Sequence, residues 1–153
     1  MSHSEDFNLQ AFLPYLLNQA AEQSSLEFHQ IYKDRYGMLR TEWRVLFHLG
    51  LFGCMTAGEI VDAAKIHKTK ISRAVHRLAE RRFLTRTRRE DDRRVELLKL
   101  TPRGVAVYED LRGIARAYDD ALSSQFDEEE LEILRRALRV LAQMPKAENV
   151  KGQ

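Results

Sequence analysis

The sequence of 153 residues has one cysteine, three prolines and no long apolar run. A single cysteine, Cys54, excludes an intrachain disulfide framework and a cysteine-based zinc site, and we expect it to be an inert, buried thiol. No segment approaches the roughly 20 apolar residues that a membrane span requires. Residues 1–6 are polar and acidic and lack the pattern of a secretion signal. These absences predict a cytoplasmic protein that has no membrane partner.

Motifs for catalysis are also missing. The sequence has no glycine-rich phosphate loop, and no serine lies in the strand–turn–helix elbow of a hydrolase nucleophile. The histidines are dispersed and have no cysteine partners, so their spacing does not indicate a metal site. They are His3, His29, His48, His67 and His76. We therefore expect neither an enzyme nor a bound metal or cofactor.

Positive charge is concentrated in one contiguous segment. Residues 65–94 contain 12 Lys and Arg but only 4 Asp and Glu, a net charge of +8, whereas the remainder of the chain carries −6. Such segregation is typical of a surface that binds phosphate groups. A solvated basic helix without any ligand is the alternative that charge counting leaves open.

Two terminal segments have apolar residues at helical spacing, 8–36 and 102–145. Pro14 either kinks the first helix or begins it, and Gly37 ends it. Asp127, followed by a glutamate three residues later, caps a further helix in the second segment. Together these segments carry more apolar surface than one thin domain can bury, so we expect them to be dimerisation helices.

The segment between them, 39–101, has the pattern of a helix-turn-helix followed by a hairpin. We expect Thr41 to cap one helix, and Thr56 to cap a short second helix through a capping box. A third helix over 68–81 combines an apolar stripe with a basic outer side, which is the arrangement of a recognition helix.

A hairpin follows directly on that helix. Residues 84–88 and 95–100 have the alternation and β-branched content of strands, and 89–94 form a charged tip between them. A hairpin that directly follows a helix-turn-helix is the wing of a winged-helix fold.

Three stretches resemble the MarR family of bacterial transcriptional regulators. Residues 39–46 are similar to the opening of the family's second helix, and 66–78 look like its recognition helix. Residues 91–94, Asp-Asp-Arg-Arg, and then 98–104 are similar to its wing and the start of its fifth helix. The resemblance covers nearly the whole chain and implies a mostly α-helical, α+β winged helix-turn-helix fold. It also implies a homodimer in which the first, fifth and sixth helices of both subunits interlock.

The function implied by the resemblance is that of a sequence-specific DNA-binding transcriptional regulator. We expect a repressor that a small aromatic or anionic ligand releases from double-stranded DNA. The alternative is a winged-helix dimer that acts as a protein-interaction module without DNA binding. Such a module would have no reason to keep both a basic recognition helix and an arginine-rich wing tip.

Two positions depart from the family pattern. Arg82 stands where the family commonly has a glycine, and a left-handed backbone there would cost an arginine about 1 kcal/mol. His67 stands where an acidic residue often precedes the recognition-helix lysine. Both departures make the base preference of relatives harder to transfer to this chain.

The expected DNA-contacting residues lie on the 68–81 helix and on the wing. Arg73 suits a guanine, because its guanidinium fork matches O6 and N7. We favour Arg94 over Arg93 for insertion into the minor groove, where the negative potential attracts an arginine. The resemblance implies that Asp92 supports this arginine, although aspartate is also an ordinary turn residue. The full set is Lys68, Thr69, Lys70, Ser72, Arg73, Arg77, Arg86, Arg93 and Arg94.

A ligand site between the dimer helices and the winged region is implied by the resemblance alone. Trp43 offers a flat face and Arg40 a partner for a carboxylate. The alternative is that the aromatic residues are plain core, because aromatic side chains dominate cores. The candidate lining residues are Phe12, Tyr15, Arg40, Trp43, Arg44 and His48.

Overall fold

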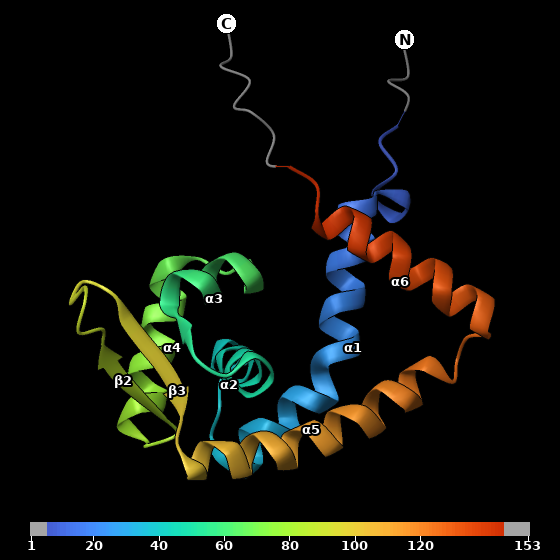
Figure 1. Ribbon diagram of the computed structural model, residues 1–153. Coiled ribbons are helices and arrows are strands. Elements are labelled where there is room, and N and C mark those ends of the chain that lie inside the picture. Colours follow the sequence, from blue (N-terminus) through green and yellow to red (C-terminus); the bar gives the residue numbers. More distant parts are fainter. Residues whose placement is uncertain (1–5, 146–153) are drawn as a thin grey trace, which may run out of the picture. The chain divides into compact units, whose positions relative to one another are not determined.

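The computed structural model describes residues 6–145, which fall into two compact units. The first unit extends to Arg116 and the second begins at Ala117, so the boundary lies within one helix. Figure 1 shows the elements. In chain order they are η1 (Leu9–Ala11), α1 (Leu13–Tyr36), α2 (Arg40–Phe52), β1 (Met55–Thr56), α3 (Ala57–Ala64), α4 (Lys68–Glu80), β2 (Leu84–Arg88), β3 (Glu96–Leu100), α5 (Pro102–Ser123) and α6 (Glu128–Ala142).

Local capping signals fix several helix ends as the sequence predicts. Pro14 lies in the first turn of α1, so it begins the helix and does not kink it. Gly37 ends α1 in the left-handed conformation, with φ of 59°. The Thr56 hydroxyl accepts the Glu59 N–H at the start of α3, and the Asp127 carboxylate accepts the Glu130 N–H at the start of α6.

The start of α2 differs from the prediction. Thr41 does not cap the helix, because α2 begins at Arg40 and Thr41 lies inside its first turn. Leu39 occupies the capping position, and its backbone N–H donates to the Glu42 carboxylate. A leucine side chain offers no acceptor for the first-turn N–H groups, so the side-chain contribution at this end is the Glu42 carboxylate bound to the Leu39 N–H.

The strands form a three-stranded antiparallel sheet in the order β1-β3-β2. The hairpin of β2 and β3 pairs Leu84 with Leu100 at one end and Arg88 with Glu96 at the other. Strand β1 has only two residues, and Met55 pairs with Leu98. The two wing strands confirm the sequence prediction, whereas β1 was not foreseen.

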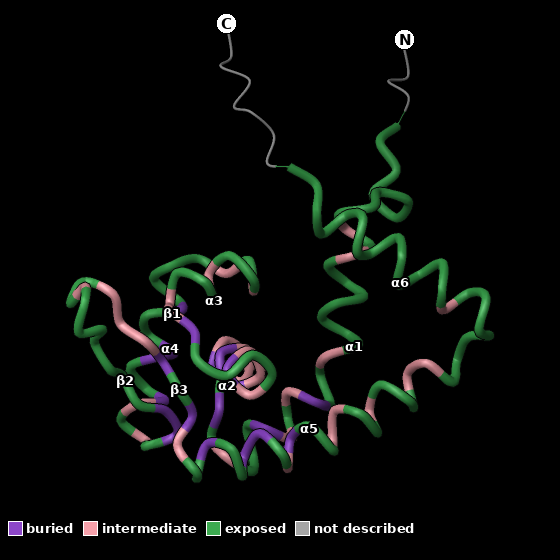
Figure 2. The backbone as a smooth tube through the Cα atoms, in the orientation of Figure 1, coloured by how far each residue is buried: buried purple, intermediate pink, exposed green. Residues whose placement is uncertain are grey.

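The buried core lies in the first unit, where α2, α4, β3 and the beginning of α5 meet (Figure 2). Each of these elements contributes aliphatic side chains that are almost fully buried, namely Val45, Leu46, Leu49, Ile71, Val75, Leu78, Leu98 and Leu111. A mostly helical chain with a small antiparallel sheet around this core is the predicted winged helix-turn-helix. Within residues 6–145, no helix is both long and apolar enough to cross a bilayer.

A tight junction joins α4, the wing and α5. Arg82 has a φ of 62°, the left-handed conformation that its place in the sequence suggested. The Thr101 hydroxyl donates to the Arg82 carbonyl at 2.6 Å, and the Thr101 N–H donates to the Phe83 carbonyl at 3.0 Å. A Cβ on Gly104 would lie 1.9 Å from the Phe83 oxygen, so only glycine permits this approach. The junction therefore fixes the wing next to the end of α4.

We predict that Arg82→Gly stabilises the protein, because glycine adopts a positive φ without strain. The expected gain in the free energy of unfolding is about 0.5–1 kcal/mol, measured by urea denaturation. The matched control is Arg82→Ala, which removes the side chain but keeps the Cβ and therefore the strain. Equal stabilisation by both variants would show that the arginine side chain, not its backbone conformation, is the source.

Candidate nucleic-acid interface

Helix α4 presents one apolar and one polar face. Its stripe of Ile71, Ala74, Val75 and Leu78 is buried in the core. The remaining positions are therefore forced outward into solvent. All the candidate DNA contacts of this helix are exposed: Lys68, Thr69, Lys70, Ser72, Arg73 and Arg77.

The N-terminus of α4 is capped by a residue that sequence reasoning treated only as a departure. The His67 Nδ1 accepts the Thr69 backbone N–H at 3.2 Å, so His67 is the N-cap. This bond requires an unprotonated Nδ1, because an imidazolium has no acceptor. The signal in the sequence was its position directly before the helix, where a capping side chain is usual.

The wing tip holds Arg94 against Asp92. The Asp92 Oδ1 accepts from both the Arg94 Nε and the Arg94 backbone N–H, each at 3.1 Å. The Arg94 guanidinium keeps the pKa of the Asp92 carboxyl below its usual range. The Arg94 side chain is still 92% exposed. Asp92 thus contacts Arg94, the arginine that we favour for minor-groove insertion.

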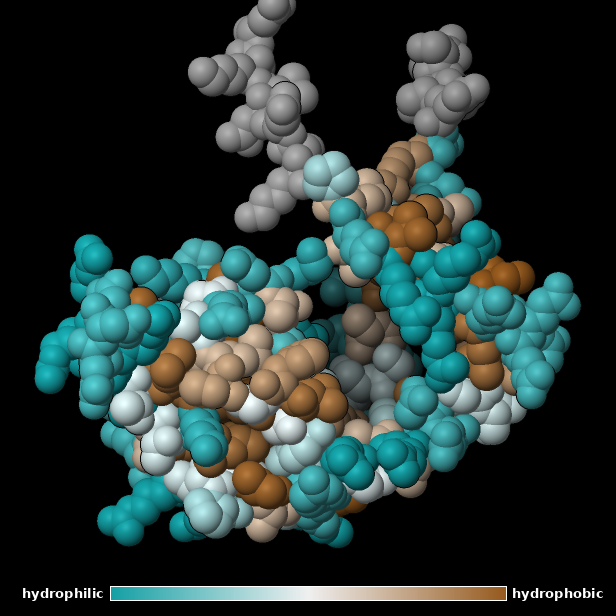
Figure 3. All heavy atoms as spheres, viewed as in Figure 1, coloured by the Kyte–Doolittle hydropathy of each residue, from teal (hydrophilic) through white to brown (hydrophobic). Residues whose placement is uncertain are grey.

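The other wing arginines have different partners. Arg86 pairs with Glu96 at 2.8 Å, and Arg89 pairs with Asp91. Arg88 donates to the Arg93 carbonyl at 3.0 Å. The Arg93 guanidinium contacts no acidic side chain in the described part of the chain. Figure 3 shows hydrophilic side chains over the wing, at the left of the view.

A groove of about 350 Å³ lies between the first turn of α2 and the outer face of α4. Its cationic lining comes from Lys70, Arg73 and Arg77, and His76 also lines it. On the α2 side lies Glu42, which is 1% exposed and whose Oε1 is 3.0 Å from the Arg77 Nε. No pattern in the sequence predicted this pair.

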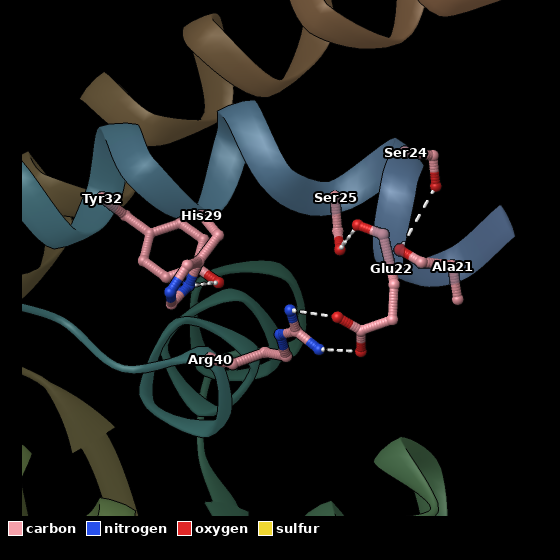
Figure 4. A network of polar contacts seen from close by, with 7 residues as sticks. All are labelled: Ala21, Glu22, Ser24, Ser25, His29, Tyr32 and Arg40. Atoms are coloured by element: carbon pink, nitrogen blue, oxygen red, sulfur yellow. Dashed lines mark hydrogen bonds and ion pairs between the residues drawn. The ribbon is translucent and has the colours of Figure 1, made fainter. Parts of the chain in front are cut away.

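The candidate ligand-site residues of α2 lie against α1. The Arg40 guanidinium pairs with Glu22 at 2.8 Å, and this contact lowers the pKa of the Glu22 carboxyl (Figure 4). Beside it the Tyr32 hydroxyl is 2.8 Å from the His29 Nδ1. Arg40, the proposed carboxylate partner, is therefore occupied by a carboxylate of the chain itself.

The aromatic candidate Trp43 belongs to a cluster of rings. Its ring packs edge-on against Phe28 and Phe47, with centroids 5.5 and 5.2 Å apart. Arg44 lies over the Trp43 ring, and its carbonyl is 2.6 Å from the His48 Nδ1. Trp43, Arg44 and His48 therefore form a continuous chain of contacts along α2.

Phe12 and Tyr15 do not join that cluster within one chain. Helix α1 meets Trp43 at Phe28, and Tyr15 lies 13 residues earlier on the same helix. At a rise of about 1.5 Å per residue, that separation is roughly 20 Å. Phe12 is 43% exposed and packs edge-on against Phe7, so it is not plain core in the single chain.

Cys54 and the histidines were the remaining residues of interest in the sequence. Cys54 is exposed, which corrects the expectation of a buried thiol. It follows Gly53, which ends α2 with a positive φ of 80°. Among residues 6–145, no group of three His, Cys, Asp or Glu side chains is placed to hold a metal ion.

Comparisons with known proteins agree on one family. A family model described as MarR family matches residues 36–95. An HTH-type transcriptional regulator of Bacillus subtilis is 26% identical over 110 residues, which are 72% of this chain and 80% of that protein.

Solved structures extend the similarity over almost the full length. A MarR family transcriptional regulator from Silicibacter pomeroyi is 30% identical, with a TM-score of 0.74, covering 89% of this chain and 99% of that one. BpsR of Bordetella bronchiseptica, whose DNA binding is regulated by 6-hydroxynicotinic acid, has a TM-score of 0.81 at 20% identity. That match covers 92% of this chain and 99% of the other, and at this identity it shows the fold alone.

We predict that Arg94→Ala weakens DNA binding more than Arg93→Ala does. Arg94 is held at the tip by Asp92, so less conformational entropy is lost when it enters a groove. The expected loss for Arg94→Ala is about tenfold or more in Kd, by fluorescence anisotropy on an operator duplex. The two variants change the net charge equally and control for each other. A larger loss for Arg93→Ala would assign the insertion to Arg93.

Proposed function

This chain belongs to the MarR family of transcriptional regulators, and from this premise we propose that it is a homodimeric repressor that a small ligand releases from its operator. It is a DNA-binding regulator with a winged helix-turn-helix. The proposal is carried by one observation, the exposed cationic face of α4 with Arg94 at the wing tip of the same unit. We place its action in the cytoplasm, where a bacterial regulator meets DNA.

The mode of DNA contact follows from position along α4. The N-terminal residues of a recognition helix reach base edges in the major groove, so we assign base contacts to Thr69 and Arg73. Lys68, Lys70 and Ser72 suit phosphates. Arg94 enters the adjacent minor groove, and Arg86, already paired with Glu96, remains near the backbone.

A second copy is needed to cover apolar surface. Large apolar side chains are partly exposed in residues 9–16 and along α6, and covering the exposed part of each would contribute a fraction of the ~1.5–3 kcal/mol that full burial of such a side chain gives. They include Leu9, Phe12, Leu13, Leu16, Ile133, Leu134, Leu138 and Leu141. A two-fold dimer through these helices presents two copies of α4 to half-sites about one helical turn apart.

The ligand class follows from the Arg40–Glu22 pair. A guanidinium that already holds a carboxylate is suited to a carboxylate ligand that displaces it. Trp43 and its neighbouring rings provide an apolar wall for an aromatic acid. We therefore propose an aromatic carboxylate as the effector, with Arg40, Trp43, Arg44 and His48 as this chain's candidate contacts.

We predict steep salt dependence of operator binding. A dimer that contacts about 8 phosphates gives a slope of about −7 in a plot of log K against log salt concentration, because bound Lys and Arg release counterions. The slope is measured by fluorescence anisotropy of a labelled duplex from the region upstream of the gene. A slope shallower than about −2 would favour the protein-interaction module instead.

We predict that Glu22→Gln tightens binding of an aromatic carboxylate, because the competing internal carboxylate is removed. With 6-hydroxynicotinic acid as the probe, calorimetry is expected to show a Kd about two- to fivefold lower, the range of an exposed ion pair. Glu27→Gln is the control, with the same chemical change on the same helix. Equal affinities of the two variants would exclude Arg40 as the carboxylate partner.

A further inference from the structure

Glu42 is the one charged side chain that the structure buries among residues 6–145. Its Oε2 accepts the Leu39 backbone N–H and so caps α2. Its Oε1 faces the Arg77 Nε on α4 at 3.0 Å, in an ion pair without the geometry of a regular hydrogen bond. A buried carboxylate is costly unless a charge of opposite sign compensates it. The burial of Glu42 therefore requires an explanation beyond the cap.

Helix capping does not provide that explanation. Glu59 in α3 and Glu130 in α6 occupy the same position in their helices as Glu42 does in α2. Each accepts the N–H of its capping residue, at 3.1 and 3.2 Å, while remaining exposed. What distinguishes Glu42 is the arginine that lies opposite.

The Nε and the two Nη atoms of the Arg77 guanidinium have different surroundings. Its Nε faces the buried carboxylate, while the side chain as a whole is 52% exposed and lines the groove beside Arg73. Neither of its Nη atoms contacts an acceptor in the described part of the chain. A guanidinium held at Nε leaves its two terminal nitrogens available, and such a fork fits the oxygens of a phosphate.

We propose that Glu42 is a positioning residue for DNA binding, which holds Arg77 by its Nε so that the Nη fork meets a backbone phosphate. This rests on the proposed function. Arg77 lies in the C-terminal part of α4, whereas bases are reached from the N-terminal part, so its contact is with the backbone. The buried carboxylate acts on the DNA only through the arginine.

Positioning of Arg77 and simple electrostatic repulsion predict opposite effects on DNA affinity when Glu42 is neutralised. Removing a negative charge beside a DNA-binding surface reduces repulsion and tightens binding. If Glu42 positions Arg77, its neutralisation frees the arginine and weakens binding instead. The two explanations therefore predict opposite outcomes for one substitution.

The experiment compares Glu42→Gln with Glu59→Gln on the full-length protein and its operator duplex. In Glu42→Gln the amide oxygen still accepts the Leu39 N–H, and the ion pair with Arg77 is lost. Glu59→Gln makes the same chemical and charge change in a capping glutamate that has no arginine partner. We expect Glu42→Gln to raise Kd about three- to tenfold, and Glu59→Gln to leave it unchanged or lower it.

The salt dependence separates positioning from a general structural effect. Loss of one phosphate contact per subunit makes the log–log slope of a dimer shallower by about 2, whereas a variant that merely folds less well keeps the slope. The proposal is overturned if Glu42→Gln binds the duplex as tightly as Glu59→Gln does. It is also overturned if the log–log salt slope of Glu42→Gln equals that of the wild type. Wild-type protein that binds no duplex would instead refute the proposed function.

Arg77→Lys provides a second test that does not alter the buried carboxylate. A lysine keeps the charge, but its single ammonium cannot contact Glu42 and a phosphate as the two sides of a guanidinium do. We expect weaker binding and a similarly shallower slope, with a thermal melting temperature near that of the wild type. Full DNA affinity in Arg77→Lys would rule out the two-sided role of Arg77.

Discussion

The burial of one apolar stripe on α4 is the constraint on which the functional surface depends. Ile71, Val75 and Leu78 are almost fully buried, and each contributes about 1.5–3 kcal/mol by leaving water. Rotating α4 about its axis would expose this stripe, so the helix has one stable orientation. The direction of Arg73 follows from that orientation, whereas Arg77 is also held by its ion pair with Glu42. Core packing thereby preorganises a surface that would otherwise be a mobile set of cations.

The junction after α4 extends this constraint to the wing. Arg82 turns the chain in a left-handed conformation, and Thr101 and Gly104 hold the turn against the start of α5. The first wing strand, β2, begins only two residues later at Leu84, which is itself buried in the core. Strain at Arg82 is tolerated because several hydrogen bonds and close contacts determine the same turn. The start of β2 is consequently fixed next to the end of α4.

Sequence reasoning succeeded where the information is local. Gly37, Thr56 and Asp127 act through hydrogen bonds within a few residues, and their helix ends were predicted correctly. It failed at Thr41, because the cap of α2 comes from Glu42, whose burial depends on an arginine 35 positions later. Strand β1 was missed because two residues carry no periodicity, and only their pairing with Leu97 and Leu98 of the distant β3 makes them a strand. The candidate interface was predicted as a set of residues, but the acidic partners that orient them were not, Asp92 excepted.

Consecutive residues of α2 connect the two surfaces of the first unit. Successive side chains on a helix point about 100° apart, so Glu42 faces α4 while Trp43 faces the rings of α1. Arg40, two residues before Glu42, is held by Glu22 of α1. A ligand changes DNA affinity only if it binds one arrangement of the protein more tightly than the other. Under the proposed function, a carboxylate that replaces Glu22 on Arg40 would act on the same helical turn that carries the Glu42–Arg77 ion pair. The first turn of α2 therefore links two ion pairs, Arg40 with Glu22 of α1 and Glu42 with Arg77 of α4.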